Sequence, residues 1–387
     1  MKHYTKRYCK SSERLWGRSS PLRISIILGT RPQIIKSAPV YSAFRRAGID
    51  CDIVNTGQHY DYEMNRQFFS ELALPDPSAD LNVGPGSPNE QVSAIIGGLG
   101  RLFDKGAPDI AIVPGDTNSA LAAGVACSKA GVPVAHLESG CRSGDFRMAE
   151  EVNRRLLDHL SQVLLCPTPS CVKNVKAERV IAQVVEDVGD TMLDSVLRYK
   201  EKVKEREADA KLGRSNGEYA FMTLHRAETV DDDKTLKSVL ESAGSMGIPV
   251  VFSVHPRTRA RMMEFGMTAG RNLRLVDPLP YLDTLALVNR SSVVITDSGG
   301  LQKEAYWLGK PTLITREVTE WGEIVEAGAA FLVGTDPARI RRGYRKALRV
   351  PAEAFRRAGR IFGKGDASAK VVRVVSRFVG SGRRARG

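Results

Sequence analysis

The stretch Thr296–Glu304 constrains the fold more than any other part of the chain. The β-branched run before it, residues 291–295, is typical of a buried parallel strand. Residues 301–309 after it predict a helix that a glycine and a proline close. A strand, a Ser-Gly-Gly turn and a helix leave backbone N–H groups unpaired at the positive end of a helix dipole, where glycine lets a phosphate approach. The turn therefore predicts a diphosphate site in which Glu304 bonds a hydroxyl of the same ligand; an ordinary strand-to-helix turn is the alternative.

The same alternation of strand and helix runs through both halves of the 387-residue chain, which predicts an α/β protein with two Rossmann-like domains. A highly charged helix around residues 190–211 and a Gly/Ser loop after it indicate the boundary between the halves. We expect four segments: a disordered basic extension over 1–20, a first domain over 21–190, a second over 191–365, and a C-terminal helix with a basic tail over 366–387.

The net charge of +13 raises the question of a nucleic-acid partner. The basic residues concentrate in 2–23 and 339–387, without interleaved aromatics or a known binding module, so we predict no nucleic-acid binding. A basic protein suits an anionic substrate. No apolar run is long enough to span a membrane, and the six cysteines lack C-x-x-C spacing, which predicts reduced thiols in a cytoplasmic protein without a membrane partner.

Polar residues follow the first two strands, at the edge where open α/β sheets bind ligands. Arg31 and Lys36 come after the strand at 23–28, and two cations there indicate phosphate contacts, although surface cations on a helical turn would look the same. Gln58 and His59 come after the next strand, either as ligand contacts or as a polar cap on the loop.

Four carboxylates follow later strands of the first half or open the next helix: Asp116, Glu138, Glu150 and Glu151. Carboxylates that share a cleft raise one another's pKa values, which prepares at least one for acid/base chemistry. The structural alternatives are a helix N-cap for Asp116 and favourable interactions with a helix dipole for Glu150 and Glu151.

Two strands of the second half end in histidine. His225 is followed by Arg226, and His255 is followed by a proline. A single histidine at a strand end is commonly structural, but two in successive positions indicate a site. No third ligand clusters with them, so we predict no metal.

These residues lie within motifs that together resemble the non-hydrolysing UDP-N-acetylglucosamine 2-epimerases over roughly residues 23–370. The matching motifs, nine in family order, are GTRPQIIKSAP, TGQHYD, PGDTNSALAA, HLESGCRS, EEVNR, TLHRAET, VHPRT, TDSGGLQKEA and TEWGE. The resemblance implies a GT-B-like fold with two domains facing a central cleft, the second of them binding UDP, and a homodimer. It also implies interconversion of UDP-GlcNAc and UDP-ManNAc, without a cofactor, through elimination of UDP and its re-addition to a bound 2-acetamidoglucal.

The resemblance assigns roles to individual positions. Those that match acid/base and catalytic-support positions are Asp116, Glu138, Glu150 and His225. Those expected to bind the UDP-sugar are Arg31, Lys36, Glu151, Arg226, His255, Ser298, Gly299, Gly300 and Glu304. Gln58 and His59 match a region that holds a second, activating UDP-GlcNAc in some members. Because Glu150 and Glu151 are adjacent, either could be the catalytic carboxylate.

The sequence departs from the family pattern in three places. Lys303 replaces a glutamate, Trp321-Gly322 replaces Arg-Pro, and Ala149 replaces a proline. The sequence around them is similar to relatives that act on UDP-2,3-diacetamido-glucuronic acid, which leaves the sugar open. A hydrolysing epimerase, a GT-B glycosyltransferase and a nucleotide-sugar or polyanion-binding protein are the alternatives to the epimerase.

Overall fold

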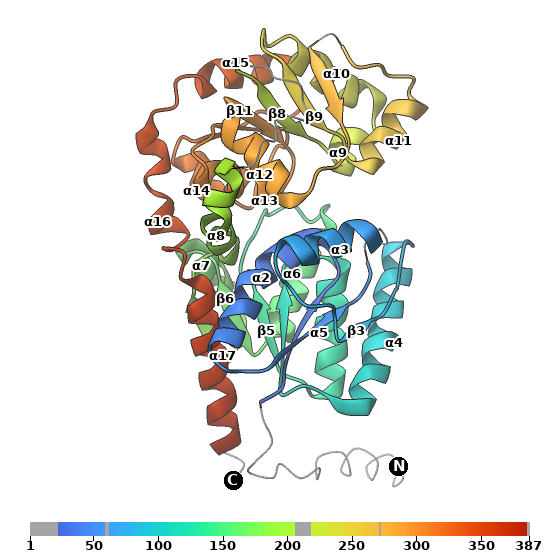
Figure 1. Cartoon of the computed structure of the whole chain (residues 1–387), viewed down its shortest axis with the longest axis vertical. Coiled ribbons are helices and arrows are strands. Elements are labelled where there is room, and N and C mark those ends of the chain that lie inside the picture. The colour runs from blue at the N-terminus through green and yellow to red at the C-terminus, as the bar shows by residue number, and fades with distance from the viewer. Residues whose placement is uncertain (1–21, 59–61, 206–217, 271, 385–387) are drawn as a thin grey trace.

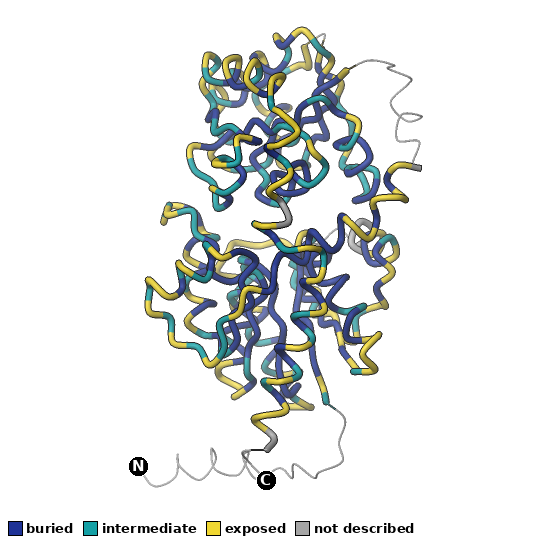
Figure 2. The backbone as a smooth tube through the Cα atoms, turned by 90° about the vertical axis from the view of Figure 1, so that its left-hand side faces the viewer, coloured by how far each residue is buried: buried dark blue, intermediate teal, exposed yellow. Residues whose placement is uncertain are grey.

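The chain forms two parallel β-sheets, each covered by helices on both faces, as Figure 1 shows for the computed structural model. The structure describes residues 22–58, 62–205, 218–270 and 272–384. The extension predicted over residues 1–20 lies outside these ranges. In Figure 2 the buried segments run through the middle of both lobes and the exposed ones lie at the rim.

The first lobe contains a seven-stranded sheet in the order β3-β2-β1-β4-β5-β6-β7. Its strands are β1 (Ile24–Leu28), β2 (Cys51–Asn55), β3 (Ala79–Asp80), β4 (Ile110–Pro114), β5 (Val134–Leu137), β6 (Val163–Cys166) and β7 (Val184–Asp187). All five residues of β1 are buried, as expected for an apolar strand with helices on both faces. The strand order reverses between β1 and β4, and ligands of open α/β sheets bind at the carboxyl ends beside such a point.

The helices of this lobe are α2 (Arg31–Arg46), α3 (Tyr62–Glu71), α4 (Pro88–Gly106), α5 (Asn118–Ala130), α6 (Ala149–Leu160) and α7 (Pro169–Ala177). Thr117 is the N-cap of α5 and accepts a bond from Ala120 N, so Asp116 is not needed for that role. Gly124 brings α5 close to α6, because a Cβ there would lie 2.5 Å from Leu157 Cδ1. Close packing of these two helices fixes the start of α6, where Glu150 stands.

The second lobe contains a six-stranded sheet in the order β10-β9-β8-β11-β12-β13. Its strands are β8 (Ala220–Thr223), β9 (Val250–Ser253), β10 (Leu273–Val276), β11 (Val293–Thr296), β12 (Thr312–Ile314) and β13 (Ala330–Leu332). Its helices are α9 (Ala227–Val230), α10 (Asp233–Gly244), α11 (Pro256–Glu264), α12 (Tyr281–Arg290), α13 (Gly299–Trp307), α14 (Gly322–Glu326), α15 (Pro337–Ala347), the 3₁₀ helix η2 (Ala352–Phe355) and α16 (Ala358–Ile361). The order reverses between β8 and β11, and the residues after these two strands therefore lie side by side.

Two helices tie the lobes together. Helix α8 (Thr191–Glu205) packs against α2 of the first lobe and against α12 and α13 of the second. Helix α17 (Ala367–Arg384) runs back along the first lobe beside α2 (Figure 1), and Val371 and Val375 join the core there. The predicted C-terminal helix thus belongs, by its packing, to the first lobe. The exact domain limits stay a prediction.

Among the described residues, no helix is long and apolar enough to cross a membrane. The described cysteines, 51, 127, 141, 166 and 171, are all buried free thiols. Burial raises the pKa of Cys51, Cys127 and Cys166 to about 12. These thiols are therefore protonated and unreactive at neutral pH.

Candidate active site

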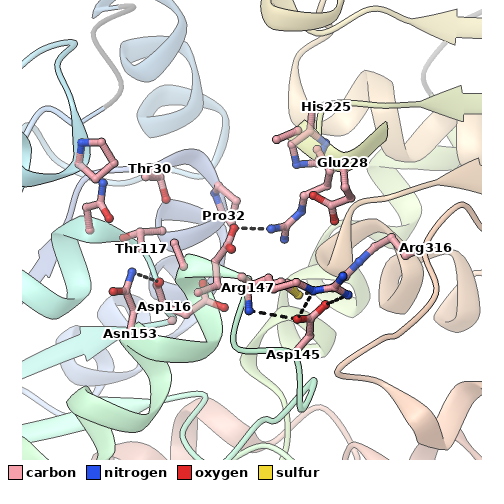
Figure 3. A pocket seen from close by; sticks show the side chains of 18 of the residues that line it. Thr30, Pro32, Asp116, Thr117, Asp145, Arg147, Asn153, His225, Glu228 and Arg316 are labelled. Atoms are coloured by element: carbon pink, nitrogen blue, oxygen red, sulfur yellow. Dashed lines mark hydrogen bonds and ion pairs between the residues drawn. The ribbon is translucent and has the colours of Figure 1, made fainter. Parts of the chain in front are cut away.

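A cavity of about 1010 Å³ opens between the two lobes, at the carboxyl ends of both sheets. Figure 3 shows Asp116 and Thr117 of the first lobe on one wall and His225 and Glu228 of the second lobe on the other. The predicted site residues that line the cavity are Lys36, Gln58, Asp116, Glu150, His225, Arg226 and His255. The structure thus brings together residues separated by more than 200 positions in the sequence.

His225 is oriented by a buried carboxylate from the neighbouring strand. Its Nδ1 lies 2.9 Å from Asp297 Oδ1, and Asp297 Oδ2 accepts the backbone N–H groups of His225 and Arg226, both at 2.8 Å. The His225 ring and these N–H bonds hold the pKa of Asp297 below its ordinary value, despite complete burial, which acts in the opposite direction. Because Nδ1 lies beside the carboxylate, Nε2 is the ring nitrogen left for proton exchange with a ligand.

Asp116 is fixed by two residues of α6. Arg154 Nη2 lies 2.6 Å from Asp116 Oδ2, and Asn153 Nδ2 donates to the Asp116 backbone carbonyl at 2.9 Å. Arg154 is almost completely buried and also lies 3.7 Å from Glu320 of the second lobe. Its carboxylate neighbours raise the pKa of Arg154 against its burial, so a permanent cation stands behind Asp116.

The adjacent carboxylates Glu150 and Glu151 lie in different environments. Glu150 lines the cavity and pairs with Arg226 across the cleft. Glu151 is fully buried, accepts the Ser143 backbone N–H at 2.9 Å and pairs with Arg155 at 3.0 Å. Glu151, expected to bind substrate, therefore fastens the loop before α6 and does not line the cavity.

Glu138, a predicted catalytic residue, does not line the cavity, and its backbone is left-handed, with φ of 72°, which is uncommon for a residue with a side chain. Its Oε2 contacts Lys36 Nζ, and its Oε1 lies 2.6 Å from Lys303 Nζ. The expected upward pKa shift is wrong for this carboxylate. Lys303 and Lys36 overcome the effect of burial and lower the pKa of Glu138 to about 2. Glu138 is thus a fixed anion and no ready proton acceptor.

The predicted Ser-Gly-Gly turn forms the start of α13, which begins at Gly299, two residues before the helix expected over 301–309. Ser298 is the N-cap, and its Oγ accepts the Leu301 N–H at 3.5 Å. Access for phosphate is not the only reason for a glycine at position 299. A Cβ there would lie 2.1 Å from Glu320 Oε1. Gly299 and Glu304 are buried on this helix.

Burial raises the pKa of Glu304 to about 7, against the opposing influence of the Tyr281 hydroxyl beside it. One carboxylate oxygen of Glu304, Oε1, has no hydrogen-bond partner among the described groups. Arg31 stacks over the ring of Phe68 at 5.7 Å. Neither Arg31 nor the residues of this turn line the cavity.

The remaining predicted site residues are His255, Gln58 and His59. His255 is the N-cap of α11, and its ring centre lies 5.5 Å from that of His225. Gln58 Oε1 accepts bonds from Ser119 N at 2.9 Å and from Ser119 Oγ at 2.7 Å, so it caps α5 while it lines the cavity. His59 lies outside the described residues.

Comparison with known proteins identifies the family. A model of the family described as UDP-N-acetylglucosamine 2-epimerase matches residues 42–376. The chain belongs to this family. It is 36% identical over 366 residues to the UDP-N-acetylglucosamine 2-epimerase of Methanocaldococcus jannaschii, covering 92% of this chain and 99% of the relative. It is 37% identical over 365 residues to the UDP-2,3-diacetamido-2,3-dideoxy-D-glucuronate 2-epimerase of Pseudomonas aeruginosa, covering 92% and 100%.

Solved structures confirm the predicted fold class. The crystal structure of the M. jannaschii UDP-GlcNAc 2-epimerase in complex with UDP-GlcNAc and UDP matches with a TM-score of 0.86 at 35% identity, over 92% of this chain and 99% of the other. A glycotransferase of kitacinnamycin, 14% identical with a TM-score of 0.58, shares the fold alone. The chain is therefore a UDP-sugar 2-epimerase by family, with two Rossmann-like domains in the GT-B-like arrangement.

Three residues of this 2-epimerase site were missed by the sequence analysis: Asp297, Lys303 and Arg154. Asp297 could have been predicted from the sequence, because it follows a strand in the motif that also contains Ser298. Its partner His225 follows another strand, and only the pairing of β8 with β11 places the two together. Arg154 and Lys303 stand in the middle of helices, where a charged residue gives no sign that it is buried.

Proposed function

We propose that this protein interconverts UDP-GlcNAc and UDP-ManNAc by elimination of UDP and re-addition. The observation that carries the proposal is the cavity in which Asp116 and Glu150 of one lobe face His225 of the other. Inversion at C2 of the sugar requires proton-transfer groups on opposite faces of one carbon. Acidic and imidazole side chains on opposing walls meet that requirement.

In the proposed reaction, a base in the cavity takes the C2 proton while the C1–O bond breaks. UDP leaves with the bonding electron pair, and C1 and C2 become the double bond of 2-acetamidoglucal. Re-addition of UDP to C1, with protonation of C2 on the other face, completes the epimerisation. Asp116, Glu150 and His225 exchange the protons, since these side chains border the cavity, and Glu138 supports the site as an anion paired with Lys36.

The departing UDP carries negative charge, which cations and backbone N–H groups stabilise. Lys36, Arg226 and His255 border the cavity and would contact the diphosphate there. Arg31 and the Ser298–Gly300 turn at the start of α13 would also contact the diphosphate once ligand binding has moved them toward it. Glu304, with its unpartnered oxygen, would accept a bond from a hydroxyl of the bound nucleotide.

A second substrate is favoured by a specific observation. The UDP-2,3-diacetamido-2,3-dideoxy-D-glucuronate 2-epimerase of P. aeruginosa is 37% identical, beside 36% for the M. jannaschii UDP-GlcNAc 2-epimerase. The same proton transfer at C2 and the same loss of UDP serve both sugars. The alternative therefore changes the sugar and leaves the chemistry intact.

We also propose that the protein works as a cytoplasmic homodimer in polysaccharide biosynthesis. Gln58, at the rim of the cavity, and His59 would contact a second, activating nucleotide sugar. These expectations rest on the family resemblance, with the position of Gln58 as the supporting contact.

Product analysis tests the proposal. Purified protein is incubated in parallel with UDP-GlcNAc and with UDP-2,3-diacetamido-glucuronic acid, and the products are separated by anion-exchange chromatography. We expect the C2 epimer of one of these UDP-sugars, with the nucleotide still attached. Free ManNAc together with UDP would indicate a hydrolysing enzyme, and the absence of any product from both substrates would contradict the proposal.

A further inference from the structure

Two of the positions that depart from the family pattern touch one another. The Lys303 ammonium lies 3.8 Å from the ring centre of Trp321, within the range of a cation–π interaction. Lys303 belongs to α13, and Trp321 immediately precedes α14. Both side chains are buried, and neither lines the cavity.

Lys303 also crosses from the second lobe to the first. Its Nζ lies 2.6 Å from Glu138 Oε1 and 2.5 Å from Asp190 Oδ2, and the lysine side chain is fully buried. A buried ammonium is stable only where carboxylates replace the water that it has lost. Two lysines, Lys303 and Lys36, are thus paired with two carboxylates, Glu138 and Asp190.

Each oxygen of Glu138 is bound to a different lysine, Oε1 to Lys303 and Oε2 to Lys36. Rotation of the carboxylate would break both contacts, so Lys303 determines where Oε2 points. Lys36, which Oε2 holds, lines the cavity. A chain of contacts thus runs from the Trp321 ring through Lys303 and Glu138 to a cation at the cavity wall.

We propose that Lys303 is a positioning residue of the epimerase, which with Trp321 holds Glu138 in place and thereby aims Lys36 at the bound UDP-sugar. Lys303 does not itself react, because its carboxylate neighbours keep it protonated and it has no access to the cavity. The inference rests on the proposed function for its catalytic consequence. The charge pairing itself does not depend on that function.

The titratable groups that face Glu138 are Lys36 from α2, Lys303 from α13, Asp190 ahead of α8 and Cys141 after β5. Lys303 is the first cause of the low pKa of Glu138. Its removal leaves Lys36 as the one cation among the three remaining groups named here. The pKa of Glu138 then rises, so a rate that depends on the Glu138 anion paired with Lys36 falls off at a higher pH than in the wild type.

The test compares Lys303→Met with Lys310→Met, a matched substitution just after the same helix. For Lys303→Met we expect kcat to fall roughly 100-fold, as displaced active-site groups do, with a smaller change in KM and a shifted acid limb. For Lys310→Met we expect kcat and the pH profile of the wild type. A Lys303→Met protein with unchanged kcat and an unchanged pH profile would overturn the proposal.

Exchange of the charges tests the contact with Trp321. Lys303→Glu alone sets three carboxylates together, and Trp321→Arg alone sets a guanidinium against the ammonium. The double variant places opposite charges in contact, so we expect it to be more active and more stable than Lys303→Glu alone, although it still lacks the bond from Lys303 to Glu138. A double variant no better than the poorer single one would contradict the proposed coupling.

A double-mutant cycle followed by thermal unfolding measures the pairing of Lys303 with Glu138 independently of enzymatic turnover. We expect Lys303→Met to lower the Tm strongly in the wild type and much less in Glu138→Gln, because the contact is already lost there. Equal effects in both backgrounds would overturn the inference. Failure of the wild type to convert either UDP-sugar would instead count against the proposed function, while this cycle still decides the role of Lys303.

Discussion

Asp297 holds His225 at the cavity wall through an Nδ1–Oδ1 contact of 2.9 Å. The carboxylate is fully buried, and its second oxygen accepts the backbone N–H groups of His225 and Arg226. One aspartate therefore lies against the ring and also fixes the turn that follows β8. The imidazolium that forms during proton transfer is stabilised by the same carboxylate.

Asp297→Asn should lower kcat by about 10²- to 10⁴-fold, because an amide can stabilise the wrong tautomer and does not stabilise the imidazolium. Affinity for UDP, measured by calorimetry, should change little. Asp277→Asn is the matched control, since Asp277 also follows a strand directly but is exposed. Wild-type kcat in Asp297→Asn would contradict the role assigned to the pair.

The neighbours Glu150 and Glu151 should respond differently to the same substitution. Glu150→Gln should lower kcat by about 10²- to 10⁴-fold with little effect on stability, since Glu150 lines the cavity and is partly exposed. Glu151→Gln should instead cost about 1–3 kcal/mol of unfolding free energy, because its buried hydrogen-bonded partners lose an ionised acceptor. Steady-state kinetics and urea unfolding of both variants test this difference. A kinetic loss in Glu151→Gln and a stability loss in Glu150→Gln would show that the roles are exchanged.

Glu138 should make stability depend on acid pH. Its pKa is lowered from 4.5 to about 2 in the folded protein, so the unfolded chain binds the proton more readily. The contribution is complete above pH 4.5 and is lost as the pH falls towards 2. The Tm of the wild type should fall through this window, and Glu138→Gln should have a lower Tm above pH 4.5 and a flatter profile. Parallel Tm profiles of the two proteins would exclude this role for Glu138.

Gly299→Ala should destabilise the protein by about 1–3 kcal/mol, because the new methyl group would displace Glu320 from its position. Glu320 bonds Arg316 at 2.9 Å and neighbours Arg154, so the disturbance would reach Asp116. Gly300→Ala is the control for stability, since its Cβ would meet only the end of Met192 at 3.3 Å. Urea unfolding should show a loss for the first variant alone, and equal losses would refute the steric explanation.

The sequence sufficed for the parts of the fold that depend on local pattern. The apolar strands followed by Gly-Thr-Arg or Ser-Gly-Gly turns predicted both sheets, and α13 begins at Gly299, two residues before the expected helix. Local pattern could not predict the position of α17, because its apolar face shows only that it packs, and not against which lobe. Its packing on α2 depends on residues more than 300 positions earlier.

The chemistry of the site was predicted less well for the same reason. Glu138 was expected to share the raised pKa of clustered carboxylates, but its neighbours are Lys36 and Lys303, which lie 102 and 165 positions away in the chain. A motif shows which residue types are present, but it does not show which charges surround them in the folded protein. The sign of a pKa shift depends on those surroundings.

Transfer of solvent hydrogen to C2 tests the central claim most directly. The protein is incubated with UDP-GlcNAc, or with the diacetamido uronic acid analogue if that is the sugar converted, in deuterated water, and the C2 proton is followed by NMR. The account predicts that the C2 epimer appears with deuterium at C2, because the proton removed by a cavity base exchanges with solvent before re-addition. An epimer that keeps its original hydrogen at C2 would contradict proton exchange at this site, and no epimer from either sugar would contradict the function itself.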